Sequence, residues 1–100
     1  MTVSRIYLDP VKVLGTEIYV GGVEEVAGKQ GEKPYYVYEI DSPKERSGFL
    51  IIDRVRIAPR ITRLSKIKSI TGFSIETRSF SCGNKEYHER VFVADTFEVE

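Results

Sequence analysis

Two strand-like runs near the C-terminus, joined by a tight turn, restrict the fold of this chain most strongly. They lie within the stretch ITGFSIETRSFSCGNKEYHERVFVADTFEVE, from Ile70 to Glu100, and the turn between them is Ser81-Cys-Gly-Asn84. Glycine and asparagine are typical turn residues between antiparallel strands. The stretch therefore predicts a long β-hairpin, and basic and aromatic residues are distributed along both of its strands.

Three further strands are expected upstream of this hairpin. Glu17–Val26 is a strand candidate interrupted by Gly21 and Gly22, and adjacent glycines inside a strand indicate a bulge or a sharp bend. Pro34–Asp41 is a second candidate, rich in tyrosine. Gly48–Ile57 is a third candidate, in which the residues alternate between two faces.

The order of the elements predicts the fold class. After Pro59, the residues Ile61, Leu64 and Ile67 recur every three positions, which favours one short helix or turn. The expected order is then strand, strand, strand, short helix, strand, strand. We therefore predict an all-β OB-fold, a five-stranded Greek-key barrel with one short helix between its third and fourth strands. An SH3-like barrel also has five short strands but usually lacks such a helical connection, so the OB-fold is preferred.

Length and charge limit the protein class. One hundred residues with 41% hydrophobic content fit one compact domain, so residues 1–100 are expected to form a single OB-fold domain with residues 1–12 as an N-terminal extension or strand. The formal net charge is zero, which argues against a polycationic binder. No apolar run reaches the roughly 18 residues of a membrane helix, and the start lacks the features of a signal peptide. We expect a cytoplasmic protein with no membrane partner.

Signals for catalysis are sparse. Cys82 is the single cysteine and there is one histidine, so neither an intramolecular disulfide nor a cluster of zinc ligands is expected. The chain has no H-E-x-x-H or G-x-S-x-G motif, and no glycine-rich phosphate loop before a helix. We therefore expect no enzyme activity, no cofactor, no metal and no small-molecule substrate.

A basic stretch distinguishes the middle of this neutral chain. From Arg54 to Ile75 there are six basic residues and no acidic residue. In an OB-fold the tyrosine-rich strand pairs with the strand that follows it, so Tyr36 and Tyr38 would lie beside Arg54 and Arg56. Flat rings that stack on bases, together with cations for phosphates, are what single-stranded nucleic acid binding requires.

The candidate nucleic-acid-binding residues follow from this pattern, with a further basic-aromatic pair toward the hairpin tip. They are Tyr36, Tyr38, Arg54, Arg56, Arg60, Arg63, Arg78 and Phe80. Tyr36 and Tyr38 project to one strand face and Tyr35 to the other, so at least one of these two sets is expected in the core.

The C-terminal half also carries a recognisable series of motifs. It has a glycine-marked strand, a Thr-Arg-aromatic segment, a glycine turn, a tyrosine and a Val-x-Val-Ala-Asp strand. The residues are Thr71-Gly72, Thr77-Arg78-Ser79-Phe80, Gly83, Tyr87 and Val91-Phe-Val-Ala-Asp95. This series resembles the end of bacterial single-stranded DNA-binding proteins. The stretch GEKPYYVYEIDSPKERSG resembles the short, tail-less variants of that family in low-GC Gram-positive bacteria and their mobile elements.

The sequence differs from the family pattern in three respects. The chain has no tryptophan, whereas many family members stack bases on tryptophans. The segment from Gly72 to Arg78 is one residue longer than usual. The sequence ends at Glu100 without the Gly/Pro-rich linker and acidic tip that full-length members use to recruit repair proteins.

Two functions are expected from these observations. The resemblance implies non-catalytic, sequence-tolerant binding of single-stranded DNA in replication, repair or recombination, by a homodimer or a homotetramer. Since the apolar run Val3–Leu8 falls outside the five barrel strands, either this run or the first barrel strand is expected to pair with a second chain. The alternative is an OB-fold protein-interaction module, a primosomal or other assembly factor with little or no affinity for nucleic acid.

Overall fold

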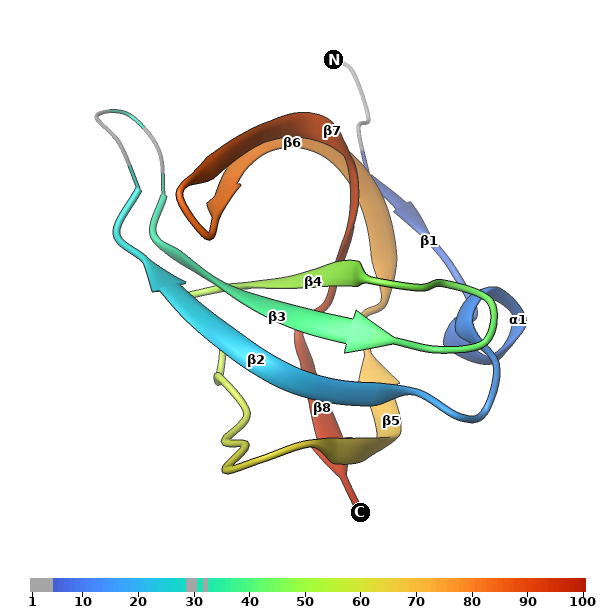
Figure 1. Ribbon diagram of the computed structural model, residues 1–100. Helices are drawn as coiled ribbons and strands as arrows, with labels where there is room; N and C mark the ends of the chain where they lie inside the picture. Colours follow the sequence, from blue (N-terminus) through green and yellow to red (C-terminus); the bar gives the residue numbers. More distant parts are fainter. Residues whose placement is uncertain (1–4, 29–30, 32) are drawn as a thin grey trace.

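Strands dominate the structure, a computed structural model that describes residues 5–28, 31 and 33–100. Within these residues there are eight strands and one short helix (Figure 1). The strands are β1 (Arg5–Tyr7), β2 (Tyr19–Val26), β3 (Tyr35–Asp41), β4 (Gly48–Asp53), β5 (Ser65–Thr71), β6 (Ser74–Cys82), β7 (Lys85–Val93) and β8 (Thr96–Val99), and the helix is α1 (Pro10–Leu14). The all-β prediction is confirmed. In the described part of the chain, no helix has the length and apolar character needed to cross a membrane.

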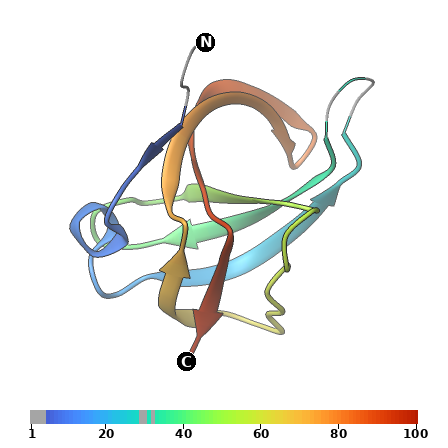
Figure 2. The same ribbon diagram turned by 180° about the vertical axis from the view of Figure 1, so that it is seen from behind.

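All eight strands belong to one curved sheet, in the order β1-β6-β7-β4-β3-β2-β5-β8 (Figures 1 and 2). β2, β3 and β4 form an antiparallel meander, and β5 lies antiparallel beside β2. β4 and β7 are parallel neighbours. Only two residues separate β5 from β6, and only two separate β7 from β8. Two sharp bends of the chain therefore connect strands that stand far apart in the sheet order.

The bulge and the hairpin turn that the glycines predicted are both confirmed. The pairing of β2 with β3 shifts its register between Val20 and Gly22, which leaves Gly21 as the extra residue of a β-bulge. The β6–β7 hairpin turns at Gly83 and Asn84, whose φ angles are 58° and 66°. Positive φ at both central residues is the type I′ geometry, which matches the twist of the flanking strands.

The predicted helix between the third and fourth strands is wrong. Residues 54–64 form an irregular connection, and Ile67, the last member of the three-residue repeat, lies in β5. The backbone N–H of Ile67 donates to the carbonyl oxygen of Ile18 at 2.8 Å. β2 and β8 both pair with β5. These backbone partners from distant parts of the chain therefore override a weak helical periodicity.

The N-terminal segment 1–12, expected as an extension or strand, contains β1 and the start of α1. β1 pairs antiparallel with β6, whereas residues 1–4 lie outside the described chain. The helix begins after Asp9, whose side-chain oxygen Oδ1 accepts a hydrogen bond from the backbone N–H of Val11 at 3.0 Å. An aspartate cap followed by Pro10 is a typical helix start.

β3 separates two hydrophobic clusters, because each of its faces carries buried side chains. The larger cluster contains Leu14, Ile18, Val20, Tyr38, Ile40, Leu50, Ile52, Ile67, Phe73, Ala94 and Phe97. The smaller cluster contains Tyr35, Val37, Ile51, Phe80, Cys82, Val91 and Val93. The β6–β7 hairpin curls over this second face (Figure 1), and at its tip the N–H of Gly83 donates to Oε1 of Glu24 on β2 at 3.2 Å.

Candidate nucleic-acid interface

Tyr38 lies in the larger hydrophobic cluster, which corrects the expectation that its ring is available to bases. Its side chain is 1% exposed, and its ring packs edge-on against Phe97 with the centroids 5.0 Å apart. The hydroxyl donates a hydrogen bond to the carbonyl oxygen of Pro59 at 2.7 Å. Burial away from water raises the pKa of Tyr38 to about 12, and Tyr36 contributes in the same direction.

Phe80 is a second correction, because its ring is buried inside the smaller cluster instead of lying on the hairpin surface. It stacks on Tyr87 with the ring centroids 5.0 Å apart and meets Phe49 edge-on at 5.6 Å. These contacts fasten the hairpin to β4. Phe80 therefore contributes to packing and offers no stacking platform in this conformation.

Tyr36 and Arg54 form a pair at the surface of the sheet. Arg54 follows directly after β4, and its guanidinium lies over the ring of Tyr36, 5.8 Å from the centroid. Its Nη2 atom also makes an ion pair with Oε1 of Glu25 at 2.8 Å. Tyr36 is half-buried. Both members of the pair are thus partly engaged within the protein.

Arg56 and Arg78 are paired with carboxylates, most of them from distant parts of the chain. Nε of Arg56 lies 3.1 Å from Oδ1 of Asp95. Nη1 of Arg78 lies 3.1 Å from both Oδ1 of Asp53 and Oε1 of Glu76. These ion pairs reduce the positive charge that the basic stretch and the hairpin present to an anion. Most of these pairs carry no signal in the linear sequence, because strand pairing and not spacing brings the partners close.

Arg60 and Arg63 remain exposed on the irregular segment 54–64, which we name the β4–β5 loop. Among the residues that the structure describes, neither has a carboxylate within ion-pair distance. The loop also presents Val55, which is 84% exposed, and Ile57, which is 81% exposed. Of the eight predicted binding residues, these two arginines are therefore the cations best placed to meet a phosphate.

Lys66 and Lys68 continue the basic stretch into β5. Lys68 is exposed, whereas Lys66 lies 3.4 Å from a carboxylate oxygen of Glu17 and 3.6 Å from one of Glu100. The negative charge of Glu100 and then the hydrogen bond to Glu17 raise the pKa of Lys66. Lys66 therefore stays charged, with most of its charge offset locally.

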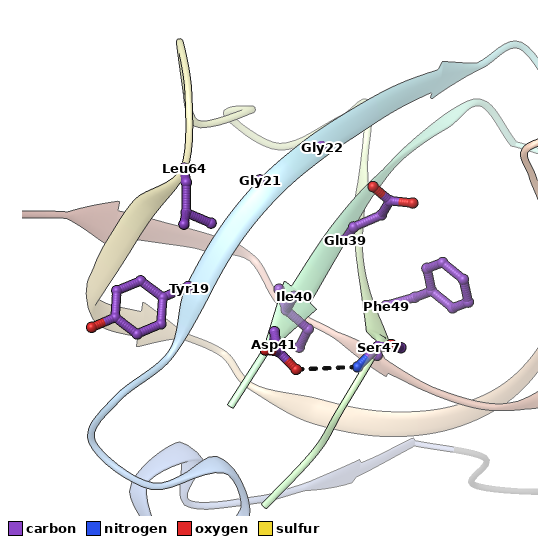
Figure 3. A pocket seen from close by; sticks show the side chains of 10 residues that line it. Tyr19, Gly21, Gly22, Glu39, Ile40, Asp41, Ser47, Phe49 and Leu64 are labelled. Atoms are coloured by element: carbon purple, nitrogen blue, oxygen red, sulfur yellow. Dashed lines mark hydrogen bonds between the residues drawn. The ribbon is translucent and has the colours of Figure 1, made fainter. Parts of the chain in front are cut away.

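A groove of about 480 Å³, which no sequence pattern predicts, crosses the outer face of β2 and β3 (Figure 3). It is lined by Tyr19, Gly21, Gly22, Glu39, Ile40, Asp41, Ser47, Gly48, Phe49 and Leu64. Leu64 reaches it from the end of the β4–β5 loop, so the groove adjoins the exposed arginines. In the sequence, only the pair Gly21-Gly22 marks the position of this groove, and that pair by itself indicates only a bulge.

The thiol of Cys82 and the imidazole of His88 both make contacts within the protein. Cys82 is buried, and this burial raises the pKa of its thiol. His88 contacts the hydroxyl of Ser79 through Nδ1 at 2.8 Å. Within the described ranges, no cluster of three or more His, Cys, Asp or Glu side chains is suited to a metal ion.

Comparisons with protein-family models, with curated proteins and with solved structures found no match for this chain.

Proposed function

We propose that this protein is a non-catalytic, sequence-tolerant single-stranded DNA-binding protein that acts in replication, repair or recombination in the cytoplasm. The observation that carries the proposal is the β4–β5 loop. There, Arg60 and Arg63 are exposed and have no carboxylate partner among the described residues. Cations of this kind can neutralise phosphates without reading the base sequence.

The strand arrangement supports assigning the sheet to the OB-fold. If β5 with β6 and β7 with β8 are each taken as one bent strand, the chain has five main strands besides β1. The meander β2-β3-β4 is followed by a strand that returns beside β2, which is the Greek-key arrangement. The irregular β4–β5 loop takes the place of the helix expected in such a barrel.

The position of the proposed surface differs from the expected one. OB-folds bind oligonucleotides on the face of their second and third strands. Here the β6–β7 hairpin covers the part of the outer face of β3 that carries Tyr35 and Val37 and buries these two residues against Phe80, whereas Glu39 and Asp41 on the same face stay exposed. We therefore assign the phosphate contacts to the β4–β5 loop beside that face, with Tyr36 as the nearest half-buried ring and Arg54 above it.

A titration of labelled oligothymidylate at several salt concentrations tests this function. Each phosphate contact on a single strand contributes about −0.7 to the slope of log K against log salt. The double variant Arg60→Ala/Arg63→Ala should therefore bind more weakly, with a slope less steep by about 1.4. The matched control Lys12→Ala/Lys44→Ala removes the same charge from α1 and the β3–β4 loop and should bind like the unmodified protein. Absence of binding, or equal slopes in both variants, would contradict the proposal.

A protein-interaction module is the second candidate, and the exposed pair Val55 and Ile57 favours it. Two large aliphatic side chains on one irregular loop are typical of a surface that another protein covers. If this function holds, unmodified protein should show no measurable affinity for oligothymidylate even at low salt.

A further inference from the structure

The groove over β2 has a low floor, because Gly21 has no side chain and the space above Gly22 is taken by the carboxylate of Glu39. A Cβ atom at Gly22 would collide with the carboxylate of Glu39, and a Cβ atom at Gly21 would lie 3.5 Å from Cδ1 of Leu64. Tyr19 and Leu64 stand on one side of this floor, while Phe49 and Glu39 stand on the other (Figure 3). The volume of about 480 Å³ falls within the roughly 300–1,000 Å³ of small-molecule sites.

Glu39 is the hydrogen-bond acceptor that the groove leaves available. It is exposed on β3, and within the described chain no cation lies within ion-pair distance of its carboxylate. Asp41, the other acid of the groove, differs. Its Oδ2 lies 3.5 Å from Nη1 of Arg46, and its Oδ1 accepts the backbone N–H of Ser47 at 3.3 Å. Because Gly22 has no side chain, the Glu39 carboxylate lies directly over the β2 backbone.

We propose that this groove holds one unstacked base of the bound single strand and that, at this one position of an otherwise sequence-tolerant interface, Glu39 makes guanine the preferred base. Guanine presents two donors side by side on its Watson–Crick edge, N1–H and the N2 amino group, and these match the two oxygens of a carboxylate. Adenine and cytosine each present only an amino group as a donor there. Thymine presents one N–H between two carbonyl oxygens, which a carboxylate repels. The apolar and aromatic side chains Tyr19, Leu64 and Phe49 contact the faces and edges of the base.

This inference rests on the proposed function, and the β4–β5 loop connects the two. Leu64, a wall of the groove, is the sequence neighbour of Arg63. A strand whose phosphates lie along Arg60 and Arg63 can therefore turn a base toward Gly21 and Gly22. The Glu39 carboxylate meets that base and not the backbone phosphates, which stay with the arginines, and a charged acceptor makes stronger hydrogen bonds than a neutral one.

Fluorescence anisotropy with labelled thymidine 15-mers that carry one central guanine, cytosine, adenine or thymine tests the inference. A single guanine avoids quadruplex formation. We expect the guanine oligonucleotide to bind about tenfold more tightly than the all-thymidine one, the size typical of one good bidentate base contact. Glu39→Ala, which removes both acceptor oxygens, should abolish this preference, whereas Glu98→Ala, the same change on the exposed face of β8, should keep it. Gly22→Ala, which displaces the Glu39 carboxylate, should also reduce the preference in protein that melts normally.

The outcomes separate the inference from the function on which it rests. If unmodified protein binds none of the four oligonucleotides, the proposed function fails and the base site fails with it. If it binds all four equally, or if Glu39→Ala keeps the guanine preference, the base site is overturned while single-stranded DNA binding stands.

Discussion

Tyr38 places its hydroxyl inside the larger hydrophobic cluster, where it donates to the Pro59 carbonyl oxygen at 2.7 Å. Its pKa is raised to about 12, first by burial and then by Tyr36, so the folded state keeps the neutral phenol. The neutral phenol therefore stabilises the folded state. This stabilisation is fully present below about pH 10, the pKa of tyrosine in the unfolded chain, and is lost as the pH rises toward 12. At pH 11 the loss amounts to about 1.4 kcal/mol, because the unfolded chain has released a proton that the folded chain retains.

Replacing Tyr38 by phenylalanine tests this assignment at the scale of one residue. The Tyr38→Phe variant loses the hydrogen bond to Pro59, which should lower the free energy of unfolding by about 1 kcal/mol at pH 8. At pH 11 the two proteins should be about equally stable, since the phenyl ring of the variant has no proton to release. Urea titrations at both pH values measure this difference. If the difference in free energy of unfolding between the two proteins stays constant from pH 8 to pH 11, the phenol of Tyr38 ionises as it does in water.

The β6–β7 hairpin is the element whose position decides which surface of β3 is open. Its contacts come from Phe80, which packs on Tyr87 and Phe49, and from Tyr35, whose hydroxyl accepts the N–H of Ser81 at 2.8 Å. Truncating Phe80 to Ala should lower the free energy of unfolding by about 3–5 kcal/mol, a large part of the stability of a domain of this size.

Cys82, buried in the same cluster, reports whether the hairpin opens. In Phe80→Ala its thiol should react faster with a disulfide reagent at temperatures below the melting transition, because the hairpin then leaves β3 without global unfolding. Thr77→Ala, on the exposed face of β6, is the control and should react as slowly as the unmodified protein. Unchanged thiol reactivity in Phe80→Ala would mean that the remaining contacts hold the hairpin without this ring.

At the scale of the whole molecule, β1 stands at one end of the sheet order and, among the described strands, pairs with β6 alone. Its residues Ile6 and Tyr7 are 52% and 67% exposed. An edge strand with apolar side chains invites pairing with another chain. We predict that the protein forms a homodimer through β1, with a homotetramer as the further step.

Sedimentation equilibrium at micromolar concentration measures this association. The expected mass is twice 11.4 kDa, or four times that value for the tetramer. Ile6→Glu should shift the protein to a monomer, while Val11→Glu, a residue of similar exposure on α1, should leave the association unchanged. A monomer at all concentrations would rule out the β1 contact.

Local features of the sequence determined the strands, their turns and the bulge. The alternation of residues fixes which side chains share a face, so Tyr36 and Tyr38 were placed together correctly. The turn at Gly83-Asn84 follows from positive φ angles that few residues adopt, and the bulge at Gly21 follows from two adjacent glycines inside a strand. These properties need only neighbours in the chain, and they could therefore be read without a structure.

The tertiary structure alone decided which of these faces are covered and which charges are free. Alternation predicts which side chains share a face of a strand, but only the curl of the β6–β7 hairpin buries Tyr35 and Val37 on the second face of β3 and takes Phe80 away from the surface. The ion pairs of Arg54 with Glu25 and of Arg78 with Asp53 join residues far apart in sequence, so spacing gives no sign of them. Segment 54–71 became loop and strand because β2 and β8 supply its backbone partners, and long-range pairing of this kind outweighs a local repeat of apolar residues.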